Sequence, residues 1–193
     1  MAESLARVED AGIACKPPRA FQTQNAQGET IVNFTNSVLL DVSAPSCCIF
    51  FCEWSPRSTI YPWPEAATPA QRRAHHRQDL ENRNGGSLGI TGLRAMRMAT
   101  PDMHLHQRLW CALSGSQPSL SIALVEDISL DLVPGEHLRV ESLTLGVRSL
   151  RVARAFLADH QLLQTDTGDL LTIACKDLSI HLREASFPQA SAP

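Results

Sequence analysis

Hydrophobic residues follow two spacings along the chain, and the spacing separates helices from strands. Within residues 3–12, 101–114 and 149–160 the apolar positions recur every three or four residues, which predicts amphipathic helices. Alternating or continuous apolar runs predict strands over residues 20–24, 30–41, 46–54, 88–98, 120–125, 128–133, 138–147, 170–174 and 178–183. Helices and hairpin-like strand pairs are mixed along the chain, so the predicted fold class is α+β.

Two local features sharpen these assignments. The strand over residues 46–54 has the continuous apolar centre Ile49-Phe50-Phe51, which is typical of a strand covered on both faces. The helix over residues 101–114 has Pro101 in its first turn and Gly115 just past its end, as the asymmetry of helix termini favours.

Residues 55–86 have a different character. Four prolines, at positions 56, 62, 64 and 69, precede the polar run QRRAHHRQDLENRNGG. Prolines interrupt regular structure, and the run lacks an apolar stripe. We therefore predict a long connecting loop, with a short helix over residues 70–80 as the alternative. Connections of this length in compact domains are often binding loops or lids.

The order of elements repeats. A strand, a helix and further strands occupy residues 88–133 and again residues 138–183. Residues 1–54 show the helix followed by three strands, without the opening strand. Units of this size imply stacked modules that share a core. The chain thus divides into a partial module (1–54), a connecting loop (55–86), a pair of βαβββ-type modules (87–185) and a disordered tail (186–193).

Composition narrows the classes of function. The 193 residues are 44% hydrophobic and 19% charged, with a formal net charge of -3. No basic face is available to neutralise phosphates, so nucleic acid is not an expected partner. The apolar runs fall short of the ~18–20 residues that span a bilayer, so no membrane partner is expected. The N-terminal residues do not resemble a secretory signal, so we expect a cytoplasmic protein. Cys48 and Cys52 lie in the apolar run CCIFFCEW, which favours small buried side chains over metal ligands or disulfide partners.

Several strings resemble the glyoxalase-like domain family of the vicinal oxygen chelate (glyoxalase/bleomycin resistance/dioxygenase) superfamily. They are CIFFCEWSPRSTIYPWPE, NRNGGSLGITGLRAMRMATPDMHLHQRLWCAL, RVESLTLGVRSLRVARAFLADHQLL and LARVEDAGIACKPPRAF, and together they cover nearly the whole chain. The resemblance implies repeated βαβββ modules whose curved mixed sheets enclose a cleft. It also implies a small-molecule ligand and a divalent metal as cofactor, for lyase, isomerase or dioxygenase chemistry.

In that family, metal ligands come from the first strand of a module and, as carboxylates, from its last strand. By resemblance, Glu53 and His181 occupy last-strand positions and are the candidate metal ligands. The first-strand positions fall near Ala95 and Ser142, which are poor ligands. The alternative for Glu53 is a strand-end acid bonded to a neighbouring loop. For His181 the alternative is a hydrogen-bonded or surface histidine.

Other candidate residues lie in the polar connection. Tyr61, Trp63, Arg72 and His75 could line a substrate cleft or form a lid, and a solvated loop is the alternative. His104 and His106 are two residues apart on a predicted helix, so they point in different directions and cannot chelate one metal together.

Three hypotheses about function follow. The first is a metal-assisted enzyme acting on a small molecule. The second is a non-catalytic module that binds or sequesters a ligand and needs no metal. The third is a fragment that depends on a partner chain. Compared with the family, the first module and the opening strand of the second are missing, which would leave an unpaired sheet edge. A homodimer is one way of covering such an edge.

Overall fold

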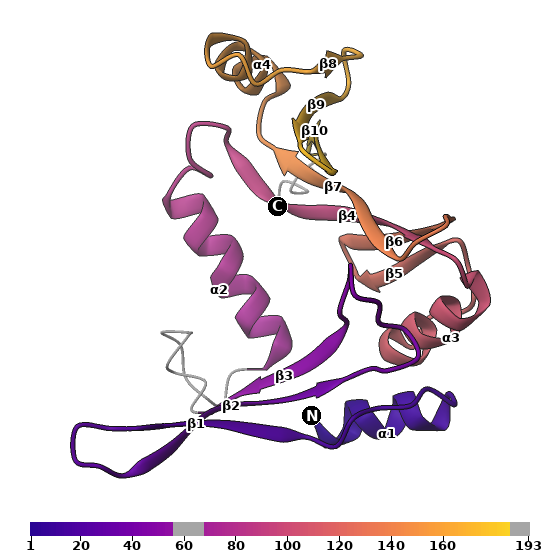
Figure 1. Cartoon of the computed structure of the whole chain (residues 1–193). Helices are drawn as coiled ribbons and strands as arrows, with labels where there is room; N and C mark the ends of the chain where they lie inside the picture. Colours follow the sequence, from indigo (N-terminus) through magenta and orange to yellow (C-terminus); the bar gives the residue numbers. More distant parts are fainter. Residues whose placement is uncertain (56–67, 186–193) are drawn as a thin grey trace, which may run out of the picture.

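The computed structural model describes residues 1–55 and 68–185, and Figure 1 shows their arrangement. The helices are α1 (Ala2–Asp10), α2 (Pro69–Asn82), α3 (Met103–Ser114) and α4 (Leu150–Asp159). The first strands are β1 (Arg19–Gln24), β2 (Thr30–Val38) and β3 (Phe50–Trp54). The remaining strands are β4 (Ile90–Thr100), β5 (Ser121–Val125), β6 (Ile128–Pro134), β7 (Arg139–Val147), β8 (Thr165–Asp166), β9 (Leu171–Cys175) and β10 (Leu178–Glu184).

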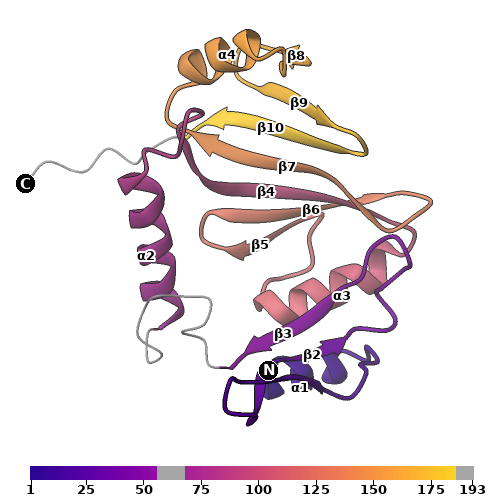
Figure 2. The same cartoon turned by 60° about the vertical axis from the view of Figure 1, so that its left-hand side comes forward.

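Strands β4 to β10 form one seven-stranded mixed sheet in the order β5-β6-β4-β7-β10-β9-β8 (Figure 2). The two central strands, β4 and β7, are antiparallel, and each has a parallel partner from its own unit, β6 and β10 respectively. The run from β7 through α4 to β10 is a complete βαβββ unit, and the run from β4 to β6 repeats its opening strand, helix and parallel return. The predicted α+β class with repeated modules is confirmed.

The helices α3 and α4 pack on one face of this sheet. Leu157 of α4 is fully buried with Leu171 and Leu182, and near α3 Leu130 and Met98 form a second cluster. Alternate residues of each strand supply these contacts, because successive side chains in a strand point to opposite faces. The opposite face is therefore left to polar residues.

The N-terminal block consists of α1 and the antiparallel sheet β1-β2-β3. Val8 of α1, Leu39 and Leu109 of α3 share a buried cluster, which attaches the block to the rest of the molecule. The expectation that β3 is covered on both faces is wrong. Phe51 packs against this cluster, but Phe50 on the other face is 50% exposed. A continuous apolar run shows that both faces of the strand carry hydrophobic side chains. Whether each face is buried depends on which other segments of the fold pack against it.

The edge of β3 pairs only with β2 among the described residues. In the two C-terminal units, the corresponding closing strands β6 and β10 each lie beside a parallel opening strand. A second copy covering the edge of β3 stays a prediction.

The connecting segment contains a 14-residue helix, α2, so the alternative of a helix over residues 70–80 is confirmed, and the continuous loop expected over residues 55–86 is wrong in this part. Thr68 is the N-cap: its side chain accepts a hydrogen bond from the backbone of Gln71, and the Gln71 side chain accepts one from the backbone of Thr68. Such a capping box stabilises the first turn, and Pro69 fits the position after the cap. The helix has no apolar stripe, so hydrophobic spacing could not reveal it.

Helix α3 begins later than expected. Asp102 is its N-cap and accepts a hydrogen bond from the Leu105 backbone at 2.9 Å, so Pro101 precedes the helix instead of lying in its first turn. The Asp102 side chain accepts the hydrogen bond of the free Leu105 amide, whereas a proline side chain has no acceptor atom. The helix therefore starts at Met103, directly after its aspartate cap. Gly115 ends the helix in a left-handed conformation, as expected.

None of the helices that the structure describes is long and apolar enough to cross a membrane.

Candidate ligand-binding face of the seven-stranded sheet

The sheet face opposite α3 and α4 carries polar side chains on its central strands. His181 of β10 lies beside Thr144 of β7, and Ser142 of β7 lies beside Arg97 of β4. Arg183 lies two residues beyond His181 and therefore shares its face. The strand pairing thus gathers two cations, an imidazole and two hydroxyls into one surface.

His181 is held in place by a threonine on the next strand. Its Nδ1 lies 3.1 Å from the Thr172 hydroxyl oxygen, and Thr172 is 8% exposed. Partial burial lowers the pKa of His181 below its ordinary 6.5, and the positive charges of Arg183 and Arg97 lower this pKa further. His181 is therefore a neutral hydrogen-bonding group at neutral pH.

The arginines of this face differ in their partners. Arg97 Nε lies 3.3 Å from Glu141, and Arg139 reaches the same carboxylate at 2.9 Å. Hydrogen bonds from Arg139 and then Arg97 lower the pKa of Glu141, so it stays ionised. Arg183 has no acidic partner in the part of the chain that the structure describes. Among the described residues, the face therefore presents one cation that no carboxylate neutralises.

The structure does not bring the two candidate metal ligands together. Glu53 lies on β3 in the three-stranded sheet, where it accepts a hydrogen bond from the Met1 amino group at 3.3 Å. His181 lies on β10 in the other sheet, with β7, β4, β6 and β5 between the two (Figure 2). By family resemblance each residue was aligned with a last strand, but the two strands belong to different sheets.

The side chains around His181 do not fit a divalent metal. Ala95 and Ser142 stand at the first-strand positions, and the charged neighbours Arg97 and Arg183 repel a cation. Over residues 1–55 and 68–185, no three His, Cys, Asp or Glu side chains form a group that could hold a metal ion. A catalytic metal centre needs about three protein ligands, and the donors around His181 fall short of that number.

Arg72 and His75, two of the remaining sequence candidates, lie on α2, outside the sheet that carries His181. Arg72 of α2 lines a cavity of about 310 Å³ together with Glu53 and Trp54, so the structure groups Arg72 with the β3 edge. His75 lies on the same helix and is exposed. Tyr61 and Trp63 lie outside the described residues.

Sequence reasoning missed Arg97, Arg183 and Thr172. The signal was present in part, because the alternation in LSIHLRE places His181 and Arg183 on one face of a strand. Nothing local shows that the strands bearing Thr172 and Arg97 lie close to that face.

Comparison with solved structures identifies the fold. A hypothetical protein from Staphylococcus aureus aligns with a TM-score of 0.51 and 7% identity, covering 95% of this chain and 62% of that one. The 2,3-dioxygenase LapB from Pseudomonas sp. KL28 aligns with a TM-score of 0.50 and 11% identity, covering 100% of this chain and 70% of that one. This chain therefore spans about two thirds of each neighbour's length.

The shared architecture is the α+β, glyoxalase-like fold with repeated βαβββ-type units and curved mixed sheets. At these identities the likeness concerns the fold alone. No protein-family model matches the sequence. A search of curated proteins also gave no match.

Proposed function

We propose that this chain is a small-molecule-binding protein of the vicinal oxygen chelate fold. It holds an anionic, oxygen-bearing ligand on the sheet face around His181 and Arg183, without a metal. The observation that carries this proposal is the unneutralised Arg183 beside a neutral His181 that Thr172 holds in place.

The chemistry of the face supports an anionic ligand. A guanidinium donates paired hydrogen bonds to a carboxylate or phosphate, and such charge-assisted bonds are stronger than neutral ones. Arg183 offers this group, and the hydroxyl of Thr144 lies beside His181 on the neighbouring strand. Arg97 adds positive potential, although Glu141 neutralises part of it.

The other candidate function is a metal-assisted lyase, isomerase or dioxygenase. It would need metal ligands that converge on one ion, and the described residues around His181 do not provide them. Ligand binding on the same face requires fewer specific groups than catalysis, since complementary charge and hydrogen bonds are sufficient. We therefore favour ligand binding over metal-assisted catalysis.

A titration tests the proposal. Lactate and inorganic phosphate are added to the full-length protein, and the His181 imidazole resonances are followed by NMR. We expect saturable shifts. Arg183→Gln should weaken binding by about 10- to 100-fold, because one hydrogen bond to a charged group is lost. Arg151→Gln is the matched control, because Arg151 is an exposed arginine on α4.

Two results would contradict the proposal. One is that neither anion shifts the His181 resonances at concentrations up to the molar range, once the shifts caused by ionic strength alone have been subtracted. The other is stoichiometric uptake of Mn²⁺ or Zn²⁺ by the purified protein, measured by elemental analysis and lost in His181→Gln and Glu53→Ala. That outcome would establish a metal centre and restore the enzyme hypothesis.

A further inference from the structure

The polar sheet face carries a second arginine close to Arg183. Gly146 of β7 is the strand partner of Arg183, and it lies two residues from Thr144 and therefore on the same face. A Cβ at Gly146 would lie 2.7 Å from Nε of Arg94, so the Arg94 side chain lies over this glycine. Since neighbouring strands are about 4.8 Å apart, Nε of Arg94 is within about 9 Å of the Arg183 Cα. That distance is within reach of an arginine side chain.

Arg94 is held in this position by two neighbours. Its Nη1 donates to the Asp127 carboxylate at 3.1 Å, and its Nη2 donates to the Thr91 hydroxyl at 3.3 Å. The Arg94 side chain is still 33% exposed, so a ligand on the face can contact it. Because Gly146 has no side chain, β7 leaves room for Arg94 at this point of the sheet.

The ion pairs at this end of the face leave two positive charges without a partner. Arg77 of α2 donates to the same Asp127 carboxylate at 2.7 Å, so one acid is shared by two arginines. Arg183 has no acidic partner among the described residues. Glu184, the next residue of β10, accepts a hydrogen bond from the Leu150 amide of α4 at 3.1 Å. Three arginines therefore meet one carboxylate at this end of the face.

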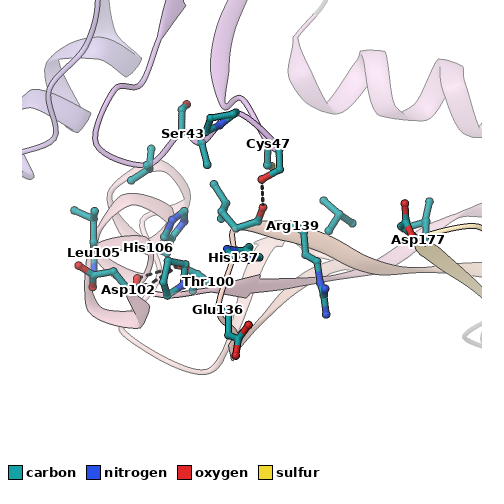
Figure 3. A pocket seen from close by; sticks show the side chains of 18 of the residues that line it. Ser43, Cys47, Thr100, Asp102, Leu105, His106, Glu136, His137, Arg139 and Asp177 are labelled. Atoms are coloured by element: carbon teal, nitrogen blue, oxygen red, sulfur yellow. Dashed lines mark hydrogen bonds between the residues drawn. The ribbon is translucent and has the colours of Figure 1, made fainter.

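The opposite end of the face is less favourable to an anion. Arg139, the first residue of β7, is bonded to Glu141 at 2.9 Å, and Arg97 shares that acid. Arg139 also lines a cavity of about 1050 Å³ (Figure 3). Four carboxylates line the same cavity: Asp41, Asp102, Glu136 and Asp177. They repel an anion, so the end of the face at Gly146 is the better place for one.

A phosphoryl dianion matches the charge at Gly146. The second pKa of a phosphate monoester is about 6, so the group carries close to two negative charges at neutral pH. Its oxygens accept paired, charge-assisted hydrogen bonds from guanidinium groups. A carboxylate has a single charge and two oxygens, so it balances only half of the surplus.

We propose that the ligand of the polar face carries a phosphoryl dianion, which Arg94 and Arg183 bind together over Gly146. This binding mode rests on the proposed anion binding at Arg183, and it adds a second arginine and a ligand class. The phosphoryl group is common to free phosphate and to phosphate monoesters, and the experiment includes both.

The test compares probes that share a phosphoryl centre but differ by one charge. Methyl phosphate is a dianion at pH 7.5, and dimethyl phosphate is a monoanion. Each is added to the full-length protein at constant ionic strength, and the His181 imidazole resonances are followed by NMR. We expect methyl phosphate to bind at least about tenfold more tightly than dimethyl phosphate. Inorganic phosphate is titrated in parallel, and the tighter of the two dianions identifies the source of the group.

Variants test the part played by Arg94. Arg94→Gln should weaken methyl phosphate binding about 10- to 100-fold, because a charged hydrogen-bond donor is lost. Arg154→Gln is the matched control, since Arg154 is 34% exposed in an ion pair with Asp166 but lies on α4, on the other face of the sheet. It should leave methyl phosphate binding unchanged. If Arg94→Gln does not fold, Gly146→Ala replaces it, because the added Cβ occupies the place of Arg94.

The outcomes separate this binding mode from the proposed function. Equal binding of methyl phosphate and dimethyl phosphate by the wild type would overturn the phosphoryl assignment. Unchanged affinity for methyl phosphate in the Arg94 variant, or in its replacement at Gly146, would overturn the role of Arg94. In either case, lactate binding that is weakened in Arg183→Gln would still support the proposed function. Absence of any shift with lactate and with the phosphates would overturn both.

Discussion

The Leu109 side chain of α3 packs against buried residues of the N-terminal block. Truncating it therefore tests how far the stability of this block depends on its contact with α3. Leu109 is fully buried and packs with Val8, Ile13, Leu39 and Val42. Leu109→Ala removes buried carbon and leaves a cavity, because the surrounding residues come from three separate segments that cannot all move inward. Such a truncation costs about 2–5 kcal/mol, and full burial favours about 3 kcal/mol or more.

In a chain of this length, about 3 kcal/mol lowers the melting midpoint by about 6–12 °C. The assay is urea denaturation followed in parallel by tryptophan fluorescence and far-ultraviolet circular dichroism. Trp54 and Trp110 lie in or next to the N-terminal block, so fluorescence is expected to report on it. In Leu109→Ala the fluorescence transition should move to lower urea than the circular dichroism transition.

Leu157→Ala is the matched control, since Leu157 is equally buried but belongs to the core beneath α4. It should cost a similar free energy without shifting the fluorescence transition ahead of the other. If Leu109→Ala lowers stability by less than about 1 kcal/mol, the inferred packing between α1, β2 and α3 is wrong. Coincident transitions in both variants would refute the separate attachment of the N-terminal block.

Two further changes have outcomes fixed by the structure. The pKa values of His106 and His181 are lowered in the folded protein, so the unfolded chain binds more protons below pH 6.5. Stability should therefore be full above about pH 7.5 and fall on acidification through 6.5, by at most about 1.4 kcal/mol per pH unit for each histidine. Urea midpoints at pH 7.5 and 5.5 measure this, and a loss that is unchanged in both His106→Phe and His181→Gln would contradict it. Gly146→Ala should cost about 1–2 kcal/mol, because the added Cβ would lie 2.6 Å from Thr91 Oγ1 and 2.7 Å from Arg94 Nε. Thermal melts with and without Arg94→Ala test this, and an equal cost in both backgrounds would rule out the clash with Arg94.

The comparison of sequence and structure separates strong local signals from weak ones. The helices α1 and α4 and the strands of both C-terminal units other than β8 follow from apolar spacing, since a buried stripe leaves a period in the sequence. The two exposed residues of β8 leave no such period. Helix α2 buries no apolar stripe. The capping box at Thr68 favours a helix, but the prolines of this segment are the stronger local signal and favour a loop. The exposure of Phe50 was unpredictable for a related reason, because cover is supplied by other segments.

The candidate sites show the same division. The alternation around His181 already placed Arg183 on its face, so one pair of the polar surface is readable in the sequence. Thr172, by contrast, reaches His181 through the pairing of β9 with β10, and Arg97 arrives through two further strand pairings. The separation of Glu53 from His181 depends on which sheet each strand joins, which no local spacing records.

The sequence by itself determined the α+β class, the repeated units and the alternation that leaves one sheet face polar, because hydrophobic period is a property of neighbouring residues. Only the tertiary structure decided what those faces meet. It placed Glu53 and His181 in different sheets and sealed His106, two residues from exposed His104, within a cavity wall. The burial and the charge environment of a side chain depend on residues that are distant in the sequence. Two histidines of one helix therefore come to differ in burial only once the chain has folded.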